Sequence, residues 1–140
     1  MNTGYNTGLA KVAVQCSADT FVVNQSLVVR INIMIYIKKI IDLLPTLQNS
    51  QQRGLLKVLQ RMVIESKYDG KLFDTCIKIW EEINNNPALR FQALKTMFNI
   101  SKKYPDFLNE IKVLTDAYYT DNLTEGVKKS VFRLIKNDLK

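Results

Sequence analysis

The feature that most constrains this chain is an apolar pattern that repeats at a shift of 38 residues. Three segments superpose at that shift, 50–65, 86–104 and 124–140. Within each segment the apolar positions lie three or four residues apart, which places them on one face of an α-helix. The superposed apolar residues are Leu55, Ala93 and Val131; Leu56, Leu94 and Phe132; and Leu59, Met97 and Ile135. A long period of this kind indicates a helical repeat, in which each unit buries its apolar face against its neighbours.

A second set of helices precedes these segments and repeats less regularly. Apolar spacing predicts helices over residues 32–48, 67–84 and 105–120, each followed by one of the regular segments. Trp80 superposes on Tyr118, and we expect both in the core. With only 5 glycines and 3 prolines, a loop-rich or all-β fold is disfavoured. The sequence therefore predicts an all-α, right-handed α-solenoid of about three antiparallel helical hairpins over residues 32–140.

The clearest single helix is predicted over residues 86–104. Asn86 is a good N-cap residue, and Pro87 is tolerated in a first helical turn. Lys102 and Lys103 form a basic last turn, and Pro105 follows as a stop signal. Similar reasoning places the start of the preceding regular helix at Ser50 and a turn or helix start at residues 69–70.

Residues 1–31 do not follow the repeat, and we expect an irregular or partly helical extension there. They lack a basic start followed by an apolar run, so no secretory signal is predicted. The longest uncharged apolar run, residues 31–37, is far below the ~20 residues that span a bilayer. We therefore expect a cytoplasmic protein with no membrane partner. An uncapped stack end tends to associate, which leaves self-association through the N-terminal end of the stack open.

Four stretches of the chain resemble a known family. They read IIDLLPTLQNSQQRGLLKVLQRM, GKLFDTCIKIW, PALRFQALKTMFNISKKYPDFLNEI and EGVKKSVFRLIKNDL. These are similar to small HEAT-like, armadillo-type helical repeat proteins of Bacteroidetes, some of which carry a DNA-alkylation-repair-like label on fold grounds. The resemblance covers residues 33–140 and implies the fold, but it implies hardly anything about activity. It carries over no catalytic residue.

The sequence shows no pattern typical of a catalytic, metal or cofactor site. There is no histidine and no CxxC pair, which excludes a Cys/His zinc site and the usual nucleophile–histidine arrangements. Glycine-rich phosphate loops are also missing. Cys76 falls on an apolar helix face and is expected to be a small buried hydrophobe. We therefore expect a non-enzymatic protein with no cofactor.

The basic residues gather on the second helix of each hairpin. The chain has a net charge of +7. Residues 50–65, 86–104 and 124–140 hold twelve Lys or Arg and three Asp or Glu, whereas the first-helix segments hold six and eight. The predicted basic face consists of Arg53, Lys57, Arg90, Lys95, Lys128, Lys129 and Arg133.

The repeat register aligns Lys57, Lys95 and Arg133 in one column and Arg90 and Lys128 in another. Such a ladder suits an acidic protein or peptide, and this is the expected partner. A nucleic-acid backbone is the alternative, because its phosphates also attract Lys and Arg. A third interpretation is that the charges only keep the stack soluble. Helix dipoles explain cations in last turns, but not Arg53, Arg90 or Lys128 in first turns.

Overall fold

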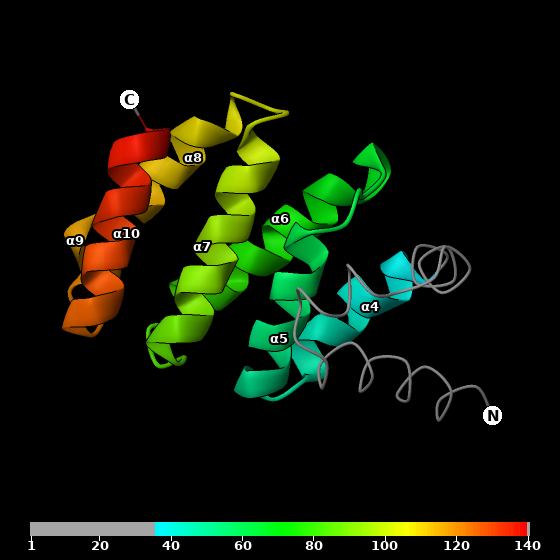
Figure 1. Ribbon diagram of the computed structural model, residues 1–140, viewed down its shortest axis with the longest axis horizontal. Coiled ribbons are helices and arrows are strands. Elements are labelled where there is room, and N and C mark those ends of the chain that lie inside the picture. Colours follow the sequence, from blue (N-terminus) through cyan, green and yellow to red (C-terminus); the bar gives the residue numbers. More distant parts are fainter. Residues whose placement is uncertain (1–35, 140) are drawn as a thin grey trace. The chain divides into compact units, whose positions relative to one another are not determined.

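The computed structural model describes residues 36–139, and this part of the chain is entirely helical. It contains seven α-helices, one 3-10 helix and no strand (Figure 1). The all-α prediction is thus confirmed. The predicted extension over residues 1–31 and the predicted domain start at residue 32 lie outside the described residues. The chain divides into two compact units, Met1–Thr75 and Cys76–Lys140.

In the first unit, helix α4 (Ile37–Leu43) leads through the 3-10 helix η1 (Leu44–Thr46) to helix α5 (Asn49–Gln60). The buried Gln52 side chain donates a 2.9 Å hydrogen bond to the carbonyl of Leu44, which ties α5 to η1. A capping box formed by Gln48 and Gln51 starts α5, so the predicted start at Ser50 is wrong by one residue. The buried apolar residues that α4, η1 and α5 contribute to this unit are Ile37, Ile40, Ile41, Leu44, Leu55, Leu56, Val58 and Leu59.

Helix α6 (Ser66–Glu81) contains the boundary between the two units. Residues 69–70 were expected at a turn or a helix start; they lie within the first turns of this helix, which begins three residues before Asp69, so only the turn is wrong. Asp69 is buried there, and a carboxylate near a helix N-terminus interacts favourably with the helix dipole. Cys76 and Trp80 are both fully buried, as predicted.

In the second unit, helix α7 (Pro87–Ser101) is buried on most of its circumference. The Asn86 side chain accepts a 2.9 Å hydrogen bond from the backbone N–H of Ala88, which confirms the predicted cap, and Pro87 occupies the first helical position. The fully or nearly fully buried apolar residues of α7 are Leu89, Ala93, Leu94, Met97, Phe98 and Ile100. Within the second unit, α8 and α10 both pack against α7.

The single helix expected over residues 105–120 is wrong. The structure has two helices, α8 (Phe107–Leu114) and α9 (Ala117–Thr120). The Thr115 hydroxyl donates to the Lys112 carbonyl, and an extended Asp116 accepts from the backbone N–H of Ala117. These local bonds compete with helix continuation. The break shifts the helical register after it, so Tyr118 is 66% exposed and its expected core position is also wrong.

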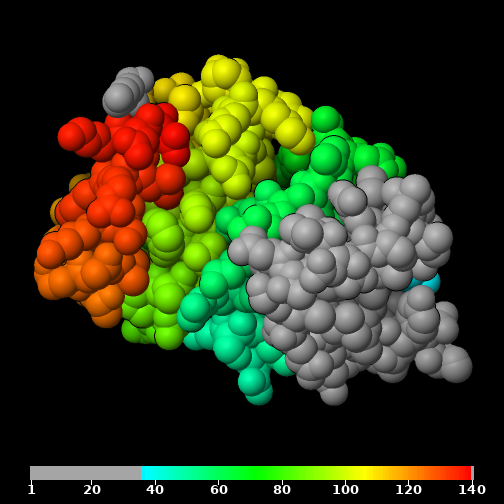
Figure 2. Space-filling model, in the orientation of Figure 1, coloured from blue at the N-terminus to red at the C-terminus, as the bar shows by residue number. Residues whose placement is uncertain are grey.

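Helix α10 (Glu125–Asp138) completes the second unit and packs against α7. The two helices run side by side in the same direction (Figure 1). Val131 of α10 is fully buried, as is Ala93, its equivalent at the 38-residue shift. In Figure 2, α10 (orange to red) lies open at the surface beside α7 (yellow-green).

Candidate binding surface

One residue of the predicted basic face, Arg90, is buried inside the second unit. Its exposed fraction is 0%, so its expected place on an exposed surface is wrong. Its Nε donates a 2.8 Å hydrogen bond to the carbonyl of Trp80, and its Nη2 donates one of 2.6 Å to the carbonyl of Tyr119. The guanidinium carbon also lies 4.6 Å from the centre of the Trp80 ring. Arg90 is therefore a structural cation that joins α6, α7 and α9.

Trp80 makes a related contact from α6. Its indole Nε1 donates a 2.6 Å hydrogen bond to the carbonyl of Leu114, the last residue of α8. Helix C-termini leave carbonyls without intrahelical partners. Trp80 thus satisfies such a carbonyl at the end of α8, and Arg90 satisfies one near the end of α9.

Burial gives the Arg90 side chain an unusual electrostatic environment. Desolvation lowers the pKa of its guanidinium from the ordinary value, and the negative charge of Glu82 partly opposes this effect. Its Nη1 is buried without a hydrogen-bond partner. Carbonyl oxygens and an aromatic face stabilise a cation without a full counter-charge. The sequence carried one signal of this role, since Arg90 lies in a first helical turn, where an exposed cation is mildly unfavourable.

The other predicted residues divide between the two units. Arg53, which is exposed, and Lys57, which is half-buried, lie on α5 in the first unit. Lys95 on α7 and Lys129 and Arg133 on α10 are exposed, and Lys128 is half-buried. These four belong to the second unit, in which α7 packs against α10. We refer to Lys95, Lys128, Lys129 and Arg133 as the basic face.

Acidic residues are sparse around the basic face. Residues 86–104 contain no Asp or Glu, and α10 contains only Glu125 and Asp138, near its two ends. Lys128 lies 3.5 Å from a carboxylate oxygen of Asp121, whose side chain is largely exposed. Lys95 lies over the ring of Phe91, with Nζ 5.9 Å from the ring centre. The face therefore has positive charge with an aromatic edge.

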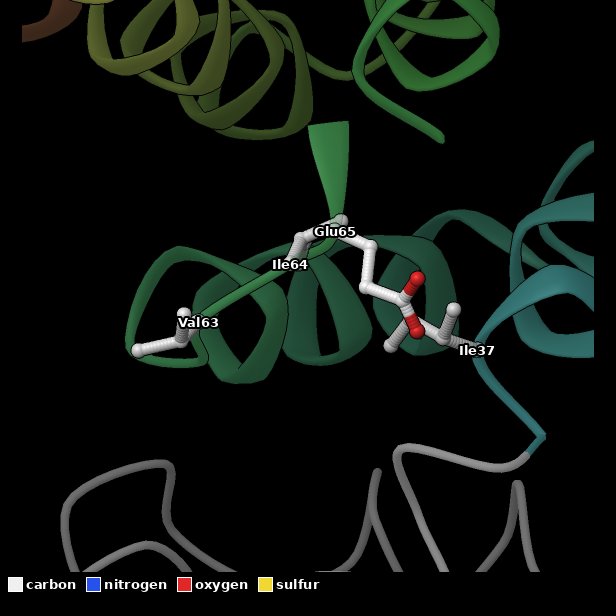
Figure 3. Close-up of a pocket in the computed structure, with 4 residues that line it drawn as sticks. All are labelled: Ile37, Val63, Ile64 and Glu65. Atoms are coloured by element: carbon white, nitrogen blue, oxygen red, sulfur yellow. The ribbon is translucent and has the colours of Figure 1, made fainter. Parts of the chain in front are cut away.

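The described residues offer little for small-molecule or metal chemistry. They contain no group of three or more His, Cys, Asp or Glu side chains placed to hold a metal ion. In the first unit, a recess lined by Ile37, Val63, Ile64 and Glu65 has a volume of about 10 Å³ (Figure 3). That is room for about one water molecule. Val63 lies within the predicted helical segment 50–65, but α5 ends before it and its side chain is 85% exposed.

Comparison with models of known protein families shows which family this helical chain matches. The family model for a HEAT repeat domain matches residues 27–138 of the chain. The chain belongs to the HEAT repeat family. Its fold is accordingly an α-solenoid, as predicted. No curated protein and no solved structure shows significant similarity to the chain.

Membership of the HEAT family sets the general role. HEAT repeat domains generally act as protein-interaction scaffolds and usually have no catalytic activity. Among the helices that the structure describes, none is both long and apolar enough to cross a membrane.

Proposed function

We propose that this HEAT repeat protein is a non-enzymatic scaffold that binds an acidic protein or peptide through the basic face. The observation that supports this function best is the matched exposure of Lys95 and Arg133. They occupy equivalent positions in two parallel helices that pack together, and both side chains are exposed. Ala93 and Val131, two residues earlier, are both fully buried.

Because of this shared register, the side chains of Lys95 and Arg133 should point to similar sides of α7 and α10. When equivalent residues of adjacent parallel helices are buried alike, the residues two positions later leave the helices on similar sides. Cations grouped in this way raise the local positive potential and attract acidic partners over a distance of about one Debye length, ~8 Å at physiological salt. Arg53 and Lys57 on α5 are proposed as further cations for the same partner class.

A nucleic-acid partner is the second candidate. It rests on two exposed aromatic rings in the basic second unit, Tyr118 at 66% and Phe132 at 49% exposure. Aromatic rings beside cations can stack on the bases of a single strand while the cations neutralise phosphates. The chain also resembles small HEAT-like proteins of Bacteroidetes, and the DNA-alkylation-repair-like label that some of them carry on fold grounds is compatible with this class of partner. The acidic-peptide proposal takes precedence because HEAT domains generally bind proteins.

The test compares two charge reversals that change the net charge equally. The variant Lys95→Glu/Arg133→Glu changes the basic face, and Lys78→Glu/Lys112→Glu changes exposed lysines of α6 and α8. Fluorescence anisotropy measures binding of a labelled 20-residue Glu-rich helical peptide and of an oligo(dT) strand at low and moderate salt. We expect salt-sensitive peptide binding that only the first variant weakens, by about tenfold. Equal weakening by both variants, or no binding at low salt, would refute the proposed face.

A further inference from the structure

The inference concerns the side of α10 that corresponds to one of the buried sides of α7. In α7, the row Arg90, Leu94 and Phe98 is 0%, 0% and 1% exposed. Arg90, the first residue of this row, bonds the Trp80 carbonyl of α6 and the Tyr119 carbonyl of α9, so its end of the row is covered from both helices. A shift of 38 residues converts it into Lys128, Phe132 and Lys136 of α10, which we call the α10 row.

The α10 row is open where the α7 row is covered. Phe132 is 49% exposed and Lys136 is exposed, while Lys128 is half-buried. The row thus combines one phenylalanine with two lysines. A half-exposed phenylalanine leaves apolar area in water, and burying that area against a partner would be favourable.

Lysines surround Phe132 on the helix surface. Lys128, Lys129 and Lys136 lie at positions i−4, i−3 and i+4 relative to Phe132, and residues at these spacings are its nearest neighbours on a helix. Glu125 lies two turns before Phe132 on the same side, and Asp121 pairs with Lys128. The local pattern is thus an apolar centre with a cationic margin.

We propose that the α10 row docks an acidic amphipathic segment of a partner protein, with a large apolar residue of that segment on Phe132 and flanking carboxylates on Lys128, Lys129 and Lys136. This inference rests on the proposed function. It adds an apolar anchor, Phe132, that a partner with acidic groups alone would not contact. The positive charge of the row favours an acidic partner over a second copy of this chain. A second copy docked symmetrically through this row would place these lysines against their own counterparts, which is repulsive.

The experiment uses two labelled peptides of equal length and charge on the full chain. Both are Glu-rich helices. One carries leucines at positions i, i+3 and i+4, and the other carries alanines there. We expect the wild-type protein to prefer the leucine peptide by about tenfold, and Phe132→Ala to abolish that preference. Phe132→Leu should restore most of it, and Val113→Ala, a change at another exposed apolar residue on α8, should leave it intact.

The outcomes separate this inference from the proposed function. Loss of both peptides in Lys95→Glu/Arg133→Glu, together with an unchanged leucine preference in Phe132→Ala, would overturn the Phe132 anchor and leave the basic face standing. No binding of either peptide by wild type would overturn both. Tighter binding of oligo(dT) than of the leucine peptide, lost in Phe132→Ala, would overturn the peptide anchor in favour of base stacking. A dimer that Phe132→Ala dissociates in sedimentation would overturn it in favour of self-association. Circular dichroism of each variant checks that it is folded.

Discussion

Helices α7 and α10 share one repeat register, yet the same positions have opposite environments. The α7 row of Arg90, Leu94 and Phe98 is buried, whereas Phe132 and Lys136 of the α10 row are exposed. At two other positions of the register the two helices agree, since Ala93 and Val131 are both buried and Lys95 and Arg133 are both exposed. The comparison shows that equivalent positions of the repeat agree in burial on some sides of the helix and differ on another, so the repeat register alone does not decide which side is covered.

The largest expected difference is between Arg90→Met and Lys128→Met, which change equivalent positions. Arg90→Met removes the donor to the carbonyl of Trp80 in a buried bond and the donor to the carbonyl of Tyr119 in a partly buried one. We expect the free energy of unfolding to fall by about 3 to 5 kcal/mol. Lys128→Met removes only a surface ion pair and should cost less than about 1 kcal/mol. Urea unfolding of the two variants measures both values, and similar losses would contradict a structural role specific to Arg90.

The next largest difference is between Leu94→Ala and Phe132→Ala. Leu94 is fully buried, so its truncation loses transfer free energy and leaves a cavity, at a cost of about 2 to 5 kcal/mol. Phe132 is 49% exposed, and its truncation should cost about 1 kcal/mol although the side chain is larger. Thermal and urea unfolding test this order. If Phe132→Ala proved the more destabilising of the two, the α10 row would be covered in solution.

A third pair compares the first helices of successive hairpins. Trp80→Phe removes the indole N–H that bonds the Leu114 carbonyl, and we expect a loss of about 1 to 3 kcal/mol. Tyr118→Phe, at the position that the repeat aligns with Trp80, should change stability by less than about 0.5 kcal/mol because the ring is 66% exposed. Trp80 is the only tryptophan, so Trp80→Phe removes the tryptophan fluorescence signal. Chemical denaturation of both variants is therefore followed by far-ultraviolet circular dichroism. Equal losses would indicate that the break between α8 and α9 does not rotate Tyr118 outward.

These pairs also show what the sequence could predict. Apolar periodicity predicted the all-α class and the burial of Trp80 and Cys76, because these follow from spacing within one helix. The cap preferences of Asn86 and Pro87 predicted the start of α7. It failed at Tyr118, where local bonds of Thr115 and Asp116 end α8 early. It failed at Arg90 because the partners of this side chain are backbone carbonyls 10 and 29 residues away in sequence. No local pattern encodes those contacts.

The smallest expected change in the free energy of unfolding comes from an exposed ion pair, in contrast to the buried charge of Arg90. The Lys71 ammonium hydrogen-bonds the Asp42 carboxylate in the first unit and lowers the pKa of that carboxyl below its usual 3.8. A lowered pKa in the folded state adds stability above the unfolded pKa, and this stability is lost as the pH falls through the folded value.

Asp42→Asn should therefore destabilise the protein at pH 6 by a few tenths of a kcal/mol, because the pair is solvent-screened. The difference from wild type should shrink as the pH falls below 3.8 and through the lowered pKa of the Asp42 carboxyl. Urea midpoints measured at several pH values test both expectations. A difference that stayed constant as the pH fell over this range would show that the substitution perturbs packing rather than charge.

The measurement that tests the central claim most directly is thiol reactivity at equivalent positions of the two helices. Leu94→Cys and Phe132→Cys are each made in a Cys16→Ser/Cys76→Ala background, and labelling by a thiol reagent is timed under native and unfolding conditions. The account predicts that the thiol at position 132 reacts within about tenfold of its unfolded rate, whereas the thiol at position 94 is protected by about a thousandfold or more, because it must wait for local or global opening. Equal protection at the two positions would contradict the claim that the α10 row is open.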